Sequence, residues 1–180
     1  MASLKLDIVQ EPPFSSLEEE ALLNLLRTAD CLERTLHLKT RDWGVTSTQY
    51  NVLRILRGAH PNGLTCSAIG SRMITAEPDI TRLLARLKAL KLIRQQRDRN
   101  DRRMVWTRIA EAGLELLRKM DPVILAAPKE LLGHLDSAQL AQFIRLLEAA
   151  RTPAAEPNEA FTCNGNRDSR EPRTRAKHSP

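Results

Sequence analysis

The sequence predicts a mainly α-helical protein that carries one small two-stranded β-ribbon. Over most of the chain, apolar residues recur every three or four positions, which is the period of an amphipathic helix. Two short runs, 92–97 and 104–109, interrupt that period, and the second is rich in β-branched and aromatic residues, as strands are. The turn between them consists of Asp, Asn and Arg, so the two runs predict a ribbon with a charged tip.

Length and composition restrict the class of protein further. A chain of 180 residues suits one domain with extensions. Its longest unbroken apolar run, Val123–Ala127, is far shorter than the roughly 20 residues of a transmembrane helix. The amino terminus lacks the apolar segment of a secretory signal. We therefore expect a protein of the cytoplasm.

The amino-terminal part predicts an arm followed by one long helix. Pro12 and Pro13 oppose helix formation, so residues 1–15 are expected to form an extended arm. Ser16 then begins a capping box with Glu19, and an apolar stripe continues to about residue 40. A helix is therefore expected over 16–40.

The central part begins with two further helices. Thr46 and Gln49 have the spacing of a second capping box, and apolar residues follow at helical intervals. A loop rich in Gly, Pro and Asn comes next. Thr65 is then placed to cap a short helix over 66–72.

The most regular helix of the sequence is expected over about 77–90. Pro78 suits its first turn, where the missing N–H is not needed. The apolar stripe must be buried, so Arg82 and Arg86 on the opposite face should point outward. That stripe consists of Ile80, Leu83, Leu84, Leu87 and Leu90.

After the ribbon, the pattern predicts two terminal helices. The first is expected over 110–135, with a kink or a restart at Pro122. Asp136 can cap the second, over 136–151. Residues 152–180 are rich in proline and poor in large apolar residues, so we expect a disordered tail there.

These elements assemble into a winged helix-turn-helix over 46–109. In that module the second helix lies in the major groove of DNA, and the ribbon forms a wing beside it. The flanking helices, 16–40 and 110–151, carry more apolar surface than a lone winged helix can bury. We therefore expect them to be dimerisation helices that pair two chains.

Charge is concentrated where this module would meet DNA. Residues 82–103 hold nine cations against two anions, a net charge of +7, whereas the whole chain carries +6. Residues 1–35 carry −4. A segregated cationic patch is typical of a polyanion-binding surface, although a solvated basic helix face is a common alternative. The position of this patch on the second helix and the wing favours DNA.

Metal, cofactor and enzyme signatures are absent from the sequence. Cys31, Cys66 and Cys163 form no CxxC pair, and the four histidines have no metal-ligand spacing. No phosphate-binding loop or nucleophile elbow occurs. We therefore expect neither a metal nor a cofactor and predict that the protein is not an enzyme, although catalysis by scattered residues stays open.

Four segments together resemble the MarR family of bacterial transcriptional regulators, over about residues 16–150. The resemblance implies an obligate homodimer that binds a pseudo-palindromic operator, with the recognition helix in the major groove and the wing in the minor groove. It implies a regulator, most simply a repressor, that responds to a ligand or to stress. The segments are GVTSTQYNVL at 44–53, GLT at 63–65, DITRLLARL at 79–87, and DRNDRR at 98–103 with the strand and EAG that follow.

The resemblance also implies roles for single residues. Asp79 and Arg82 match the pattern of the recognition helix, and Asp101 would orient Arg103 into the minor groove. Arg86 either contacts DNA or pairs with a wing carboxylate. The expected DNA-binding residues are Thr65, Pro78, Asp79, Thr81, Arg82, Arg86, Arg99, Asp101 and Arg103.

One position departs from the family pattern. Lys91 stands where the family usually has glycine before the first wing strand. A left-handed backbone at a residue other than glycine costs about 1 kcal/mol.

The resemblance implies a response to a small aromatic or lipophilic effector, or to cysteine oxidation. His37, Trp43, Tyr50 and Arg54 are the candidates near the expected cleft, although ordinary packing is the commoner role of such residues. Cys31 is either a redox sensor or, more commonly for cysteine, a small buried hydrophobe.

The sequence leaves one alternative function of another class. A winged helix can serve as a protein–protein adaptor that has lost DNA binding. The presence of Arg82, Asp101 and Arg103 argues against that alternative.

Overall fold

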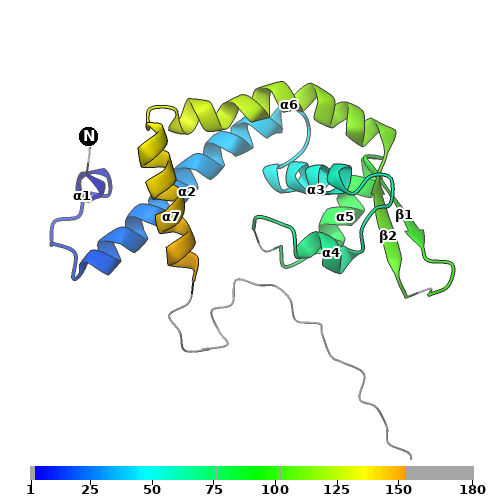
Figure 1. Cartoon of the computed structure of the whole chain (residues 1–180), viewed down its shortest axis with the longest axis horizontal. Coiled ribbons are helices and arrows are strands. Elements are labelled where there is room, and N and C mark those ends of the chain that lie inside the picture. Colours follow the sequence, from blue (N-terminus) through cyan, green and yellow to red (C-terminus); the bar gives the residue numbers. More distant parts are fainter. Residues whose placement is uncertain (1–2, 76, 102, 153–180) are drawn as a thin grey trace, which may run out of the picture.

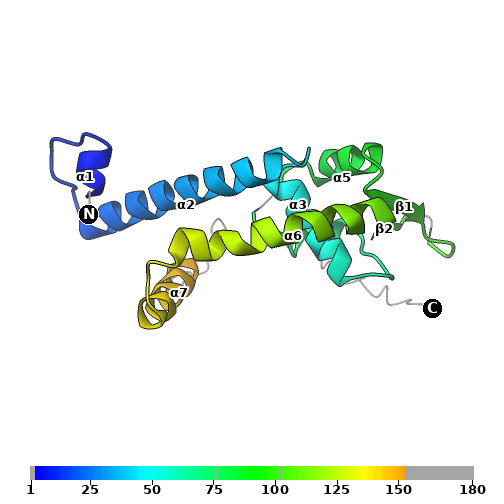
Figure 2. The same cartoon turned by 90° about the horizontal axis from the view of Figure 1, so that it is seen from above.

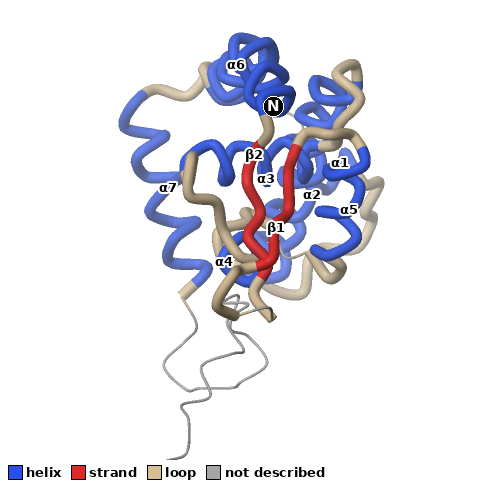
Figure 3. Tube along the Cα trace, turned by 90° about the vertical axis from the view of Figure 1, so that its right-hand side faces the viewer, coloured by secondary structure: helices blue, strands red, loops and turns tan. Residues whose placement is uncertain are grey.

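The computed structural model describes residues 3–75, 77–101 and 103–152, and its elements follow the predicted order (Figure 1). Strands β1 and β2 pair antiparallel, from Ile93 opposite Ile109 to Arg97 opposite Val105 (Figure 3). The predicted class, mainly α with a small β-ribbon, is therefore confirmed. The elements are α1 Leu4–Asp7, α2 Leu17–Arg41, α3 Ser47–Gly58, α4 Cys66–Gly70, α5 Ile80–Ala89, β1 Ile93–Arg97, β2 Val105–Ile109, α6 Glu111–Leu132 and α7 Ser137–Arg151.

The molecule has a winged helix at one end and a helical arm at the other. α2 and α6 contact each other and extend side by side away from the winged helix (Figure 2). Lys39 of α2 donates a hydrogen bond to the Glu130 carboxylate of α6 at 2.6 Å, which ties the two helices together. α7 follows at the end of α6 far from the winged helix, and none of its residues is buried.

The hydrophobic core lies inside the winged helix. α3 and α4 bury the apolar side predicted from their period, and the first half of α6 closes the core from the opposite side. α5 buries Leu83, Leu84 and Leu87 as predicted, but the predicted burial of Leu90 is wrong, because Leu90 follows the last turn of the helix and is 50% exposed. The largest fully buried apolar side chains are Val52, Leu53, Leu56, Ile69, Leu84, Leu87, Leu117 and Met120. Each such side chain contributes roughly 1.5–3 kcal/mol relative to an exposed one, so the winged helix carries most of the burial energy of the single chain.

Two of the helices begin at complete capping boxes. Thr46 accepts from the Gln49 N–H while the Gln49 side chain accepts from the Thr46 N–H, and Asp136 and Gln139 repeat the arrangement before α7. Each box satisfies two backbone N–H groups that lack a partner within the helix. The sequence therefore located these two starts correctly.

The amino-terminal segment differs from the extended arm predicted for residues 1–15. Leu4–Asp7 forms one helical turn, α1, with Leu4 buried. The two prolines restrict only their own backbone and the residue before them, so they do not prevent a turn this far upstream. At the start of α2 the predicted box is half formed, because Ser16 accepts from Glu19 but the Glu19 carboxylate accepts from the preceding serine.

Other predicted boundaries move by a few residues. α4 ends at Gly70 rather than 72, and each strand begins one residue later than predicted. α5 begins at Ile80 rather than 77, because Asp79 caps it from outside and Pro78 lies in the turn before the cap. The tail predicted over 152–180 lies outside the described residues, except for Thr152 at the end of α7.

Of the kink or restart predicted at Pro122, the restart is wrong and the kink stays a prediction. α6 runs without interruption through both Pro122 and Pro128. A proline inside a helix costs about 3 kcal/mol, because it removes one backbone hydrogen bond and crowds the preceding turn. Met120 and Ile124, buried on either side of Pro122, offset that cost by packing.

Lys91 adopts the left-handed conformation expected from its position, with φ of 59°. The Leu92 N–H donates to the Leu87 carbonyl at 3.0 Å, and the Lys91 N–H donates to the Lys88 carbonyl at 2.9 Å. These two bonds form a Schellman motif, which ends α5 and turns the chain into β1. The motif therefore forms with lysine in the place usually taken by glycine.

Within the described ranges, no helix combines the length and the hydropathy that crossing a membrane requires.

Candidate nucleic-acid interface

Helix α5, the expected recognition helix, is held so that its cationic side faces solvent. The Asp79 carboxylate accepts from the Arg82 N–H at 2.9 Å, which fixes the first turn. Because Leu83, Leu84 and Leu87 are buried, the opposite face must be exposed. That exposed face carries Thr81, Arg82, Ala85 and Arg86, as predicted.

The arginines of this surface keep their charge available for a ligand. Among the ion pairs between described residues, none involves Arg82, Arg86, Arg99 or Arg103. One of the two roles left open for Arg86, pairing with a wing carboxylate, is therefore not realised in this structure. Guanidinium groups without a carboxylate partner can bind phosphate or base edges without first breaking an ion pair.

Asp98 closes the wing turn, a role that the sequence analysis missed. Its carboxylate accepts from the backbone N–H groups of Asn100 and Asp101 at 2.8 and 3.0 Å, and from the Trp106 indole N–H at 2.8 Å. These donors hold the pKa of Asp98 below its usual range, the Asp101 N–H having the largest effect. The sequence did contain a signal, since aspartate followed by Asn and Asp favours a turn closed by its own side chain.

The predicted contact between the Asp101 and Arg103 side chains is not present. The Asp101 carboxylate instead accepts from the backbone N–H of Arg103 at 2.9 Å. A carboxylate reaches an N–H two residues later without fixing a long side chain, so this bond costs less rotamer entropy than a bond to the guanidinium. Asp101 thus shapes the turn, and its orienting role on DNA stays a prediction.

Thr65 is positioned between α4 and the wing. Its hydroxyl accepts from the Ala68 N–H at 3.3 Å and caps α4. The neighbouring Leu64 exchanges two backbone hydrogen bonds with Thr107 of β2, at 2.9 and 2.8 Å. The start of α4 is therefore tied directly to β2 of the wing.

Comparison with known proteins identifies the family. A sequence model of the MarR family matches residues 43–104. A MarR transcription factor of known crystal structure from Planctomyces limnophilus is 36% identical, with a TM-score of 0.60 over 76% of this chain and 99% of that one. The chain belongs to the MarR family. The resemblance predicted from the sequence is thus confirmed.

Two further relatives show how far the similarity extends. The HTH-type transcriptional regulator TtmR of Methylorubrum extorquens (strain PA1) is 32% identical over 106 residues, 59% of this chain and 53% of that protein, so this chain spans about half the length of TtmR. Sco3205 of Streptomyces coelicolor, a MarR family regulator solved in complex with DNA, is 22% identical with a TM-score of 0.66 over 81% of this chain and 94% of that one. At that identity the likeness shows the shared fold alone.

These relatives also bear on the predicted function. They are transcriptional regulators, so the prediction of a DNA-binding transcriptional regulator is confirmed at the level of the family. The alternative of a protein–protein adaptor without DNA binding receives no support from them.

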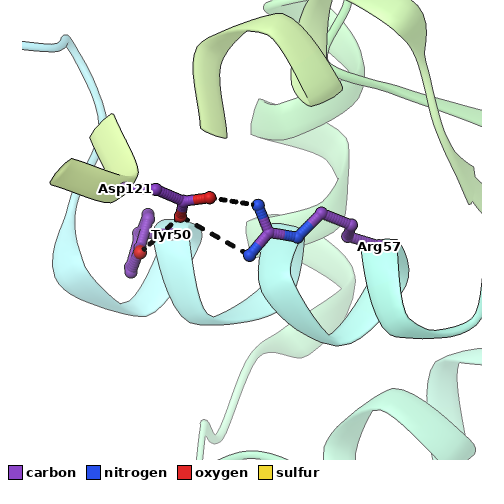
Figure 4. A network of polar contacts seen from close by, with 3 residues as sticks. All are labelled: Tyr50, Arg57 and Asp121. Carbon is purple, nitrogen blue, oxygen red and sulfur yellow. Dashed lines mark hydrogen bonds and ion pairs between the residues drawn. The ribbon is translucent and has the colours of Figure 1, made fainter. Parts of the chain in front are cut away.

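In this MarR family member, the effector candidate Tyr50 belongs to the core, and the candidate Arg54 is exposed beside it. Tyr50 is buried and donates its hydroxyl hydrogen to Asp121 of α6 at 3.2 Å, and Arg57 binds the same carboxylate (Figure 4). Arg54 lies over the Tyr50 ring, 5.9 Å from its centroid. Burial, followed by the charge of Asp121, raises the pKa of Tyr50. These contacts join α3 to α6, which is the packing role that the sequence left open for Tyr50.

The other two candidates line cavities. Trp43 borders a cavity of about 520 Å³ between the carboxyl end of α2 and Val123 of α6. His37 borders one of about 390 Å³ between α2, the start of α3 and α5, to which Arg82 and Arg86 also contribute. These two positions are therefore the ones placed to meet a small molecule.

The cysteines differ from expectation in one respect. Cys31 is exposed on α2, so its description as a small buried hydrophobe is wrong for the single chain. The apolar stripe of α2 is formed by other residues of the helix, and Cys31 lies next to that stripe rather than in it. Cys66 is half-buried at the start of α4, and Cys163 lies outside the described residues.

Proposed function

We propose that the chain binds a pseudo-palindromic DNA operator as a homodimer and acts as a repressor that a ligand or stress signal releases. One observation carries this proposal. α5 and the wing strand β1 contact each other, both α5 and the wing turn carry exposed arginines, and Arg82, Arg86, Arg99 and Arg103 have no ion-pair partner among the described residues.

The two cationic elements have different tasks on DNA. α5 enters the major groove, where Arg82 and Arg86 reach base edges or phosphates near its exposed side. The wing turn places Arg99 and Arg103 at the minor groove, whose negative potential attracts guanidinium groups. Thr65 caps α4 and Asp79 caps α5, Pro78 lies in the turn just before that cap, and Thr81 lies beside Arg82 on the exposed face of α5.

The homodimer accounts for apolar surface that the single chain leaves exposed. Leu22, Leu25 and Leu26 form a stripe on α2 that is 40–57% exposed. Ile144 and Leu146 of α7 are 54% and 61% exposed, and Leu125 of α6 is 58% exposed. A monomer rarely keeps contiguous apolar surface of this kind, so a second copy is the partner that we propose.

The effector that we propose is a small aromatic or lipophilic molecule. The cavity beside Trp43 has an apolar wall of Leu38 and Val123 and a polar edge of Lys39 and Asp42. A pocket of this kind holds an apolar ring and orients one polar substituent. Because α6 and α2 form its walls, an occupant can change how the helical arm meets the winged helix.

We propose regulation rather than catalysis as the activity. No group of three or more His, Cys, Asp or Glu side chains within the described ranges could hold a metal ion. A regulator of this kind works where bacterial DNA is, in the cytoplasm, which is the location that we propose.

The test is binding to duplexes covering the DNA that flanks the protein's own coding region, at two or more salt concentrations. We expect a defined complex whose affinity falls steeply with salt. Arg82→Ala and Arg103→Ala should each weaken binding and lower the salt slope by about one. Arg34→Ala on α2, where Arg34 pairs with Asp30, is the matched control and should leave both quantities unchanged. Binding that is independent of salt or of Arg82 would contradict the proposal.

A further inference from the structure

Between its arginines, the reading face of α5 presents methyl groups. Thr81 and Ala85 are exposed and four residues apart, so they lie on one face of the helix. Both side chains are small, which lets the helix backbone come close to the base edges. In the major groove, thymine is the base that offers a methyl group to an apolar side chain.

A larger apolar side chain stands close to the start of this helix. Ile74, in the connection between α4 and α5, is 86% exposed, the highest value for a large apolar residue within the described ranges. It precedes Asp79, the cap of α5, by five positions. Exposure of an isoleucine costs free energy in water, because its apolar surface stays hydrated.

The backbone of Ile74 is anchored although its side chain is exposed. Its N–H donates to the Asn51 side-chain carbonyl of α3 at 3.4 Å. The preceding residue, Met73, packs against the core. The backbone is therefore held at this position while the Ile74 side chain lies in solvent.

The connection between α4 and α5 also lies on the appropriate side of the molecule. In Figure 1 this connection and the wing turn both lie on the side of the winged helix away from α6. The reading face of α5 and the wing are the elements that we propose to contact DNA. The described part of the connection that carries Ile74 therefore lies on the same side of the winged helix as the wing turn.

We infer that Ile74 is a specificity-determining residue that packs on the 5-methyl group of a thymine in the major groove, with Thr81 and Ala85 beside it. The inference rests on the proposed function and adds the base that this surface selects. A thymine methyl is an apolar group in a groove otherwise lined by hydrogen-bonding atoms, so it is the partner that an exposed isoleucine fits there.

The experiment uses the full chain and replaces thymine by uracil, which removes only the methyl group. Operator duplexes are first selected from a random library with the unaltered protein. Each thymine of one half-site is then replaced in turn, and affinities are measured by titration. The unaltered protein should bind about fourfold more weakly when one particular methyl is removed, the effect of losing one buried carbon.

Three variants assign this effect to Ile74. Ile74→Ala should bind the thymine duplex about fourfold more weakly per half-site and should no longer distinguish thymine from uracil at that position. Ile74→Val, which keeps a branched apolar group, should still distinguish them. Leu90→Ala is the control, because Leu90 is 50% exposed at the opposite end of α5 and should leave the discrimination unchanged. Thermal melting checks that all three fold.

The outcomes separate this inference from the proposed function. If the unaltered protein binds its selected duplex equally well at every thymine-to-uracil change, the inference is overturned while DNA binding stands. The same holds if Ile74→Ala discriminates as well as the unaltered protein, or if its main effect is on sedimentation, which would place Ile74 in a contact between copies. If no duplex is enriched at all, the proposed function fails and the inference fails with it.

Discussion

The winged helix and the helical arm have similar apolar periodicity but opposite surroundings. In the winged helix, Leu53, Leu56, Leu84 and Leu87 are at most 1% exposed. In the arm, α7 buries no residue, and the leucines of the α2 stripe are 40–57% exposed. The apolar side of the helices is thus buried within one chain in the winged helix, whereas in the helical arm it stays exposed in the single chain.

Charge separates the two regions as well. The winged helix carries the cationic window of residues 82–103, whereas residues 1–35, which include most of α2, carry a net negative charge. A polyanion is therefore attracted to one end of the molecule and repelled by the other. The winged helix buries its apolar side chains within the single chain and leaves its cationic surface free for a ligand. The helical arm leaves apolar side chains exposed, and these need a second chain to bury them.

The largest effect should come from a charge on the uncovered α2 stripe. Leu26→Glu should raise the dimer dissociation constant about a hundredfold or more, because symmetry places the change in the interface twice and each buried leucine is worth roughly 1.5–3 kcal/mol. Sedimentation checks this, and circular dichroism should show that the fold is kept. Asn24→Glu, an equally exposed polar position of α2, is the control. A stable monomer of the unaltered protein would contradict the proposal that a second copy buries the apolar stripe of α2.

In the winged helix, a single added carbon atom in the core should lower the stability of the fold. Gly113 lies where α6 begins, and a Cβ there would collide with the Leu92 carbonyl and come within 2.8 Å of the Ile109 side chain. Gly113→Ala should therefore destabilise the chain by about 1–3 kcal/mol, the usual cost of overpacking.

Chemical denaturation measures this change. The matched control is Gly58→Ala at the end of α3, where a Cβ meets nothing within 4 Å, so the variant should be neutral or slightly stabilised. Equal stability of Gly113→Ala and the unaltered chain would show that α6 can move away from the wing.

The wing turn should depend on pH through Asp98. The pKa of Asp98 is lowered in the folded chain. The ionised carboxylate therefore stabilises the folded turn fully above the ordinary pKa of about 3.8, and this stabilisation is lost as the pH falls through the lowered pKa. In a Trp43→Phe background, Trp106 fluorescence should stay constant from pH 7 to 4.5 and change only below about 3.8.

The variant Asp98→Ala should loosen the same turn at all pH values. Ordering the turn on DNA then costs additional backbone entropy, so operator binding should weaken about tenfold although a negative charge has been removed. Tighter binding by Asp98→Ala would show that the wing acts only through its net charge.

The smallest effect should be a gain in stability at the junction of α5 and the wing. Lys91→Gly removes the strain of a left-handed lysine and should stabilise the chain by up to about 1 kcal/mol, with a raised Tm. Lys88→Gly, three residues earlier inside α5, should instead lose about 0.5–1 kcal/mol. A lower Tm for Lys91→Gly would show that the lysine side chain contributes more than its backbone costs.

Much of this molecule follows from local sequence. The period of apolar residues gave α3, α5 and the outward direction of Arg82 and Arg86, because an amphipathic helix has one way to bury its stripe. The capping residues Thr46 and Asp136 located two helix starts, since their bonds form within four residues. The left-handed turn at Lys91 followed from the resemblance to the MarR family, which usually has glycine at that position.

Tertiary structure decided the features whose energy comes from distant residues. α6 continues through Pro122 because packing on both sides outweighs a local penalty, and Tyr50 lies in the core because Asp121, 71 residues later, accepts its hydroxyl hydrogen. The sequence by itself determined which faces are apolar and which are cationic; only the fold decided which of them find a partner within the chain, because that depends on contacts between residues far apart in the sequence.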